Sequence, residues 1–173
     1  MKNKLNLGCG KDYRLGWVNL DCNKKMKADV YADLEKKLPF KDNTFEYVYT
    51  EHVLEHIHNF IPLMAELKRI CKNNAIIEIR VPHALSMLAY QDPTHVRFFT
   101  YRSFDYFTDS ELGFYDLPKF KIISRSLNYV VKEWTFLNKI INPFLNINPR
   151  YYERLFGWIF PCGEVRYKLQ VIK

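Results

Sequence analysis

The sequence predicts an α/β fold built on a mainly parallel β-sheet. Its first apolar stretch, residues 4–7, runs directly into Gly8 and Gly10, and a second short apolar stretch ends at Asp21. Further short apolar stretches follow, each ended by Gly, Asp or Pro, as expected of buried strands. Glycines after a strand let the backbone approach a ligand closely, and an acid at the tip of the next strand can accept both hydroxyls of a ribose. These observations predict a nucleotide-type ligand at the carboxyl edge of the sheet.

Only six residues, 11–16, connect the glycine loop to the second apolar stretch. Six extended residues span about 20 Å, which is enough to run back along a short strand but not to include a full crossover helix. A dinucleotide site needs a helix N-terminus to hold its pyrophosphate and places its acid about 20 residues after the glycines. The short connection therefore favours a nucleoside ligand without phosphates and predicts a short or missing first crossover helix.

The other elements follow in order along the chain. We expect strands at residues 4–7, 17–20, 28–32, 45–50, 75–81, 120–131 and 164–172. A helix beginning near Pro62 would place Leu63, Leu67 and Ile70 on one face, and a short helix is expected at residues 102–107. This order predicts a sheet with its ligands at the carboxyl ends of the strands.

Residues 132–162 separate the last two expected strands and are too many for a hairpin turn. This segment is rich in aromatic residues, and we expect two amphipathic helices in it, at 134–141 and 150–160. It could complete the core in place of the missing helix, cover the substrate as a lid, or rest on a membrane surface. In the last case Lys139, Arg150 and Arg154 would meet phosphate groups. We favour a lid or a core-completing role.

The composition predicts a single cytoplasmic domain over residues 1–173. The chain is 48% hydrophobic, has no apolar stretch near the roughly 18 residues of a membrane span, and contains four scattered cysteines. Its net charge of +7 suits an anionic partner, which could be nucleic acid, a membrane surface or a phosphorylated glycan carrier. The charge does not choose among these partners, and nothing in the sequence indicates an oligomeric state.

Five segments of the first 130 residues resemble, in the right order, the motifs of the class I S-adenosylmethionine-dependent methyltransferases. Residues 5–10 resemble the first motif, Asp21 the ribose-binding acid, 33–40 the adenine-side segment, 42–48 the fourth strand and 52–57 the segment after it. The resemblance implies a Rossmann-like sheet with a reversed final strand, methyltransferase activity and S-adenosylmethionine as the cofactor. The cofactor-binding residues that it implies are Asn6, Gly8, Cys9, Gly10, Asp21, Asp33, Leu34 and His52.

Two features depart from the pattern of that family. Asn6 stands where an acid is commonest in the first motif, and the first crossover helix is nearly absent. We therefore expect the methionine end of the cofactor pocket to be built differently.

A cluster of histidines and an acid follows the fourth expected strand. His52, Glu55 and His56 are spaced i, i+3 and i+4, so a helix here would place them on one face. One interpretation of the cluster is structural. A second is catalytic, with His56 or His95 taking a proton from the acceptor while Asp92 orients the imidazole. A third is a divalent metal site formed by His52, Glu55 and His56, similar to the Glu-x-x-Glu-His arrangement of certain metal-dependent O-methyltransferases.

Two details bear on the metal interpretation. His83 or His95 could supply a fourth ligand, and a histidine in place of the first glutamate shifts the preference from magnesium towards transition metals. The His-x-x-Glu-His pattern also matches a class of zinc peptidases, but here it follows a sheet strand and does not lie on a long helix.

Residues 92–97 and the phenylalanines after them resemble a segment of methyltransferases associated with sugar and cell-surface polysaccharide pathways. We therefore expect O-methylation of a saccharide or another small hydroxyl-bearing acceptor, with His56 and His95 as the catalytic residues. Two alternatives stay open beside the peptidase. The chain could methylate RNA, which we do not favour, or protein, or it could be a non-catalytic cofactor-binding domain that docks a partner through residues 132–162.

Overall fold

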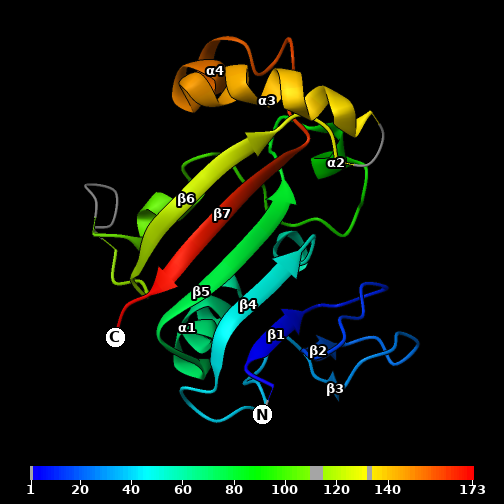
Figure 1. Ribbon diagram of the computed structural model, residues 1–173, viewed down its shortest axis with the longest axis vertical. Coiled ribbons are helices and arrows are strands. Elements are labelled where there is room, and N and C mark those ends of the chain that lie inside the picture. The colour runs from blue at the N-terminus through cyan, green and yellow to red at the C-terminus, as the bar shows by residue number, and fades with distance from the viewer. Residues whose placement is uncertain (1, 110–114, 132–133) are drawn as a thin grey trace.

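The computed structural model describes residues 2–109, 115–131 and 134–173, and these form one seven-stranded sheet with the strand order β3-β2-β1-β4-β5-β7-β6 (Figure 1). Strands β1 to β5 run parallel to one another, whereas β7 runs antiparallel to both β5 and β6. The prediction of a mainly parallel sheet with a reversed final strand is therefore confirmed.

The strands are β1 (Lys4–Leu7), β2 (Val18–Asp21), β3 (Val30–Tyr31), β4 (Phe45–Glu51), β5 (Cys71–Pro82), β6 (Phe120–Asn128) and β7 (Glu164–Val171). The helices are α1 (Phe60–Ile70), α2 (Met87–Tyr90), α3 (Asn138–Ile147) and α4 (Pro149–Leu155), with single 3-10 turns η1 (Leu54–His56), η2 (Ser103–Phe107) and η3 (Thr135–Leu137). Helix α1 begins two residues before Pro62, because a proline in the first turn loses only an N–H that would have no helical partner. None of the helices in the described part of the chain is long and apolar enough to cross a membrane.

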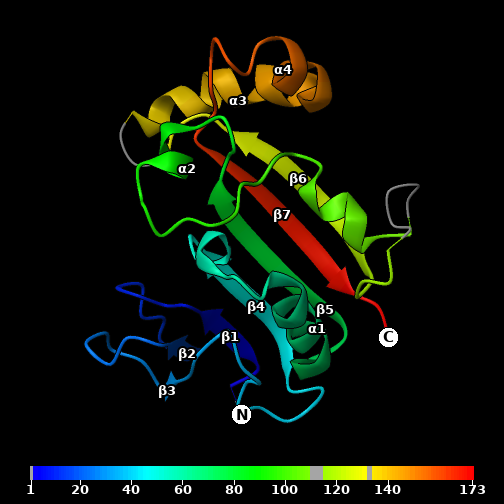
Figure 2. The same cartoon turned by 180° about the vertical axis from the view of Figure 1, so that it is seen from behind.

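Among the described elements, helix α1 covers only one face of the sheet (Figure 2), where it buries Leu63, Leu67 and Ile70. No helix forms between β1 and β2, so the predicted loss of the first crossover helix is confirmed. In Figure 1 the opposite face of β4, β5 and β7 carries no helix. The exposed side of a sheet must then be polar, because no layer shields it from water.

Polar side chains line that open face. The Tyr47 hydroxyl donates to the Glu78 carboxylate, and Arg80 donates to the same carboxylate at 3.2 Å. The Arg14 guanidinium, from the short connection that replaces the crossover helix, lies 3.6 Å from the centre of the Tyr49 ring. Charged groups and tyrosines thus take the place that a packed helix would need apolar residues to fill.

The insertion before β7 lies at the upper edge of the sheet, with α3 beside the carboxyl end of β6 and not on the open face (Figures 1 and 2). Of its residues, Leu145 and Tyr152 are buried with the core, whereas Trp134, Phe144 and Trp158 are exposed. The predicted helical insertion is therefore present, and most of its aromatic surface faces outward.

Candidate active site

The two glycines after β1 serve different purposes. Both have left-handed backbones, with φ of +67° at Gly8 and +48° at Gly10. A Cβ at Gly8 would lie 2.4 Å from a methyl group of Val53, so Gly8 allows the loop after β1 to pack directly on the segment after β4. A Cβ at Gly10 would meet no atom within 4 Å, so the loop leaves open space there. Cys9, between them, is buried.

Asp21 ends β2 beside this loop and is only 8% exposed. Its Oδ2 accepts the N–H of Gly10 at 2.7 Å, and its Oδ1 accepts the N–H of Asn23 at 2.8 Å. An ionised carboxylate has about four acceptor sites, so roughly two remain for the hydroxyls of a ribose. Together with the open space at Gly10, this arrangement fits the nucleoside part of S-adenosylmethionine.

The side chain of Asn6 stabilises the short connection after the glycine loop by hydrogen bonds. Its amide nitrogen donates to the carbonyl of Asp12 at 2.6 Å and to the side-chain oxygen of Asn19 at 3.1 Å. Asn19 in turn accepts the N–H of Arg14 at 2.8 Å and donates to its carbonyl at 2.9 Å. The two buried asparagines therefore satisfy the backbone that a crossover helix would have satisfied internally. Sequence reasoning missed Asn19, although a polar residue inside an apolar β2 pattern was a visible signal.

The two predicted adenine-side residues, Asp33 and Leu34, lie in different environments. Asp33 is exposed, and its carboxylate accepts the N–H of Glu35 at 2.9 Å, a hydrogen bond that lowers the pKa of Asp33. Leu34 is buried in the core. Asp33 therefore orders the turn after β3 and stays accessible to a ligand.

The segment after β4 is not an α-helix, so the predicted shared helical face does not form. His52 has a left-handed φ of +53°, and only Leu54–His56 form a single 3-10 turn. The predicted set of metal ligands is therefore divided. Glu55 and His56 have ligand atoms within 4.8 Å of one another and of His95, whereas His52 groups in the same way with Glu51 and Glu164.

His52 is held between two carboxylates. Its Nδ1 lies 3.3 Å from Glu55 and its Nε2 lies 3.6 Å from Glu164 at the start of β7. Burial alone would lower the pKa of His52, but the two carboxylates outweigh this effect and raise the pKa to about 9. His52 is therefore cationic at neutral pH. Sequence reasoning missed Glu164, because it meets His52 only through the pairing of β7 with β5.

Glu55 connects the turn η1 to the loop after β5. Its backbone carbonyl accepts the N–H groups of Val96 and Arg97 at 2.9 and 3.1 Å. Its side chain is 1% exposed, and among the described residues neither carboxylate oxygen has a hydrogen-bond partner. The Nε2 atom of His95 lies 3.9 Å from one of these oxygens. The charged partners of this buried carboxylate are thus His52 and His95, and its oxygens can still accept a hydrogen bond from a polar ligand.

A chain of hydrogen bonds fixes the tautomer of His56. Thr94 donates its hydroxyl hydrogen to Asp92 at 2.6 Å, and this bond lowers the pKa of Asp92 and keeps it ionised. The same Thr94 oxygen lies 2.8 Å from Nδ1 of His56, and because its hydrogen is already used it must accept there. In this neutral form of His56, Nδ1 carries the hydrogen and Nε2 has the free electron pair.

His95 and His83 have other hydrogen-bond partners than His56. Nδ1 of His95 lies 3.0 Å from the carbonyl of Ala89, which can only accept, so His95 uses its N–H to hold helix α2. His83 is fully buried, and its Nε2 lies 2.8 Å from Glu153 of α4. The cluster of Glu55, His56 and His95 does not include His83, which is therefore not the fourth metal ligand that the sequence suggested.

A cavity of 690 Å³ lies beside this cluster, between the loops after β4 and β5 and the end of β6. Its lining includes His52, His56, Asp92 and His95 together with Ser86, Gln91, Tyr129 and Trp134. The predicted catalytic residues thus meet in one cavity, next to the predicted cofactor residue His52. The structure brings these segments together from more than 80 residues of chain, as expected at the carboxyl edge of a parallel sheet.

Sequence comparison with known proteins finds similarity to methyltransferases. Residues 5–79 match the family model described as a methyltransferase domain. An uncharacterized protein of Methanocaldococcus jannaschii is 31% identical over 97 residues, covering 49% of this chain and 42% of that protein. An uncharacterized methyltransferase of Schizosaccharomyces pombe is 39% identical over 54 residues, covering 31% of this chain and 19% of that protein. The matches therefore span less than half the length of either curated relative.

Solved structures share the fold over nearly the whole chain. A SAM-dependent methyltransferase from Archaeoglobus fulgidus superposes with a TM-score of 0.66 at 18% identity, over 96% of this chain and 85% of that one. An S-adenosylmethionine-dependent methyltransferase from Mesorhizobium loti superposes with a TM-score of 0.55 at 15% identity, over 97% and 90%. The [4+2]-cyclase SpnF superposes with a TM-score of 0.61 at 15% identity, over 98% of this chain and 75% of that one. Because that protein is a cyclase, the fold alone does not determine the reaction. The chain therefore has the class I fold of the S-adenosylmethionine-dependent methyltransferases, and its residues 5–79 match a methyltransferase domain.

Proposed function

We propose that this protein transfers the methyl group of S-adenosylmethionine to a hydroxyl of a saccharide or another small acceptor, with His56 as the general base. The observation that supports this proposal most is the hydrogen-bond chain from Asp92 through Thr94 to His56 at the wall of the acceptor cavity. It prepares an unprotonated Nε2, which is the group that a hydroxyl acceptor needs in order to lose its proton.

The cofactor residues would act by positioning. Asp21 would hold the ribose hydroxyls, and the loop with Gly8 and Gly10 would let the backbone approach the nucleoside. When bound, S-adenosylmethionine supplies an electrophilic methyl carbon, so the protein mainly has to align the acceptor. His52 lines the acceptor cavity between two carboxylate partners, and the next residue, Val53, lies against Gly8 of the cofactor loop.

The surroundings of His56 support its role better than those of His95. A proton taken up by His56 would be stabilised by ionised Asp92 through Thr94 and by the buried carboxylate of Glu55. His95 already uses Nδ1 to hold Ala89, so it is better suited to positioning the loop. We therefore assign the base to His56 and a positioning role to His95.

The lining of the acceptor cavity supports a small hydroxylated substrate. Its volume of 690 Å³ lies within the range of about 300–1,000 Å³ that is common for small-molecule sites. Ser86 and Gln91 offer hydrogen-bonding groups, whereas Tyr129 and Trp134 offer ring faces on which a sugar can stack. A divalent metal held by Glu55, His56 and His95 is the competing arrangement, because it would occupy the electron pair that the base requires.

The first experiment is calorimetric titration with S-adenosylhomocysteine, with NAD as the control ligand and a repeat after chelator treatment. We expect binding at micromolar concentration for the first ligand and none for NAD, with no loss on chelation. Transfer of labelled methyl groups is then measured with separate panels of saccharides, RNA and peptides. Transfer confined to RNA or peptides would overturn the acceptor, cofactor binding without any transfer would favour a non-catalytic domain, and loss on chelation would favour the metal.

A further inference from the structure

Helix α3 has its polar side turned towards the protein and its apolar side turned outward. Asn138, Asn142 and Asn146 are spaced four residues apart, so they lie on one side of the helix. Their side-chain oxygens accept the backbone N–H groups of Val130, Tyr129 and Leu127 at 3.0, 2.8 and 2.8 Å. The asparagines thereby satisfy the edge of the sheet along β6 and the residues after it. This attachment fixes the rotation of α3, so Ile140, Phe144 and Ile147 stay exposed while Leu145 reaches the core.

The outward side of this region carries a group of exposed apolar residues, which we call the aromatic face. We define it by Trp134, Phe144, Ile147, Trp158, Ile159 and Phe160, whose exposed fractions lie between 61% and 79%. These residues come from α3, from the turn before it and from the turn after α4. Exposed apolar surface on this scale is unfavourable in water and marks a site of interaction.

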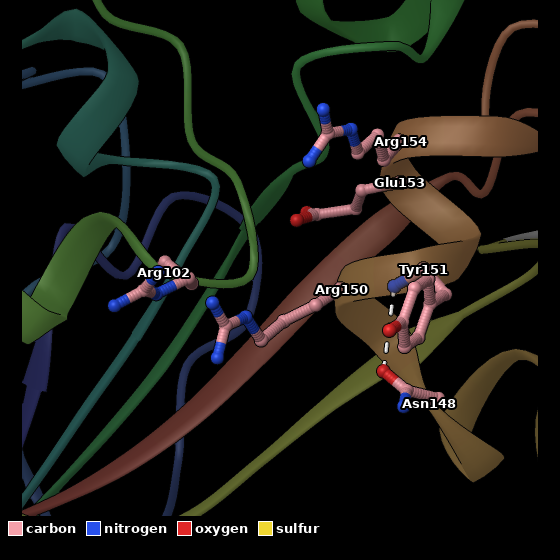
Figure 3. Close-up of a pocket in the computed structure, with 6 residues that line it drawn as sticks. All are labelled: Arg102, Asn148, Arg150, Tyr151, Glu153 and Arg154. Atoms are coloured by element: carbon pink, nitrogen blue, oxygen red, sulfur yellow. Dashed lines mark hydrogen bonds between the residues drawn. The ribbon is translucent and has the colours of Figure 1, made fainter.

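A hollow lined by arginines adjoins the apolar groove beside α3, because Asn148 and Tyr151 line both. Arg102, Arg150 and Arg154 extend into one hollow of 530 Å³ (Figure 3). Arg102 pairs with Asp105 at 2.7 Å, whereas Arg150 and Arg154 have no carboxylate within ion-pair distance among the described residues. Glu153 is the acid in this hollow, and its Oε1 is already bound by His83 and by the backbone of Tyr101. The hollow is therefore positively charged and open to an anionic group.

We propose that the aromatic face and these two arginines dock the protein on an anionic lipid surface. Helices with one apolar side and cationic residues beside it lie in the plane of the lipid headgroups, where tryptophans are favoured. Arg150 and Arg154 would bind the phosphates of the headgroups while Phe144 and Trp158 enter the acyl boundary. A second copy of the chain fits less well, because the described residues around the face offer no free carboxylate to pair with the arginines.

The docking face joins the acceptor cavity. Tyr129 lines both that cavity and the apolar groove beside α3, and Trp134 belongs to both the face and the cavity. In the docked protein the acceptor cavity would therefore lie next to the lipid surface. As a consequence that rests on the proposed function, the acceptor would be a hydroxylated headgroup carried by a lipid.

The docking step is tested by co-sedimentation with phosphatidylcholine vesicles, with and without phosphatidylglycerol, in the absence of cofactor. We expect binding only to the anionic vesicles. Arg150→Ala with Arg154→Ala should weaken it about 30-fold, at about fivefold for each arginine near an anionic surface. Phe144→Ser with Trp158→Ser should weaken it at least about tenfold. Circular dichroism spectra would check that each variant is folded.

The matched control is Leu15→Ser with Ile123→Ser, which removes two exposed apolar side chains outside the aromatic face and should leave binding unchanged. The proposal would be overturned if this control lost as much vesicle binding as Phe144→Ser with Trp158→Ser, or if the wild type did not bind anionic vesicles. A wild-type dimer that Phe144→Ser with Trp158→Ser separates, without vesicle binding, would assign the face to a second copy. Since the assay needs neither cofactor nor turnover, its failure is distinct from a failure of the proposed reaction.

Discussion

The cofactor end and the acceptor end of the site are built in opposite ways. The proposed cofactor end is centred on Gly8, Gly10 and Asp21, which lie within one strand-loop-strand unit, and the N–H of Gly10 donates directly to Asp21. The acceptor end combines the loops after β4 and β5 with the end of β6, and its histidines depend on partners far along the chain. The matched family domain, residues 5–79, ends before the loop after β5. This difference indicates that the first region carries the common chemistry and the second carries the specificity.

Replacement of His56 should separate the two ends most clearly. We expect His56→Ala to lower the turnover rate by about 1,000-fold, since general base catalysis commonly contributes 100- to 10,000-fold. The affinity for S-adenosylhomocysteine, measured by calorimetry, should change less than about twofold because His56 lies on the acceptor side. His58→Gln alters an exposed histidine two residues away and serves as the control. Wild-type turnover in His56→Ala would remove this residue from the mechanism.

Replacement of Asp21 should affect cofactor affinity, which replacement of His56 should leave nearly unchanged. Loss of hydrogen bonds from two ribose hydroxyls to a charged acceptor should lower the affinity for S-adenosylhomocysteine by about 100-fold in Asp21→Ala. Because Asp21 also holds the N–H groups of Gly10 and Asn23, the thermal unfolding temperature is measured in parallel. Asp42→Ala removes an exposed carboxylate and should leave the affinity unchanged. Unaltered affinity in a folded Asp21→Ala protein would contradict the ribose assignment.

The same contrast explains what the sequence could predict. The glycine loop, Asp21 and the missing crossover helix follow from residues that are neighbours in the chain, so local spacing was sufficient. The pairing of His52 with Glu164 joins residues on different strands, and no local pattern marks it. A left-handed backbone at His52 also broke the expected helical face, and a single sequence does not indicate such a conformation at a histidine.

Two features of the sequence were informative but needed another interpretation. The spacing of Asn138, Asn142 and Asn146 already showed a polar helix side, but the usual assumption places the apolar side of a helix inward. Here the polar side faces in, because the unpaired backbone along β6 needs hydrogen-bond partners. Asn6, which the resemblance implies as a cofactor-binding residue, also has a structural part, because its amide binds the backbone of the short connection.

The ion pairs of His52 with Glu55 and Glu164 should make stability depend on pH. The pKa of His52 is raised to about 9 from 6.5, so its contribution is fully present below pH 6.5 and is lost as the pH rises through about 9. With a discount for partial exposure, we expect this contribution to be about 2 kcal/mol. Urea unfolding of the wild type and of His52→Gln, from pH 6 to about pH 10, should show a difference that shrinks over this range. A constant difference would mean that folding does not raise the pKa of His52.

Thr94 should give the smallest effect and the finest test of the acceptor end. Thr94→Val keeps the shape of the side chain but removes the hydroxyl that connects Asp92 to Nδ1 of His56. Because the imidazole keeps its place but loses the acceptor that fixes its tautomer, we expect turnover to fall only about tenfold, with little change in cofactor affinity. Thr94→Ser retains the hydroxyl and should restore most of the activity, which a purely structural role for the methyl group would not allow. If Thr94→Val and Thr94→Ser were equally active, Asp92 would have no part in orienting His56, and the case for His56 over His95 would lose its main support.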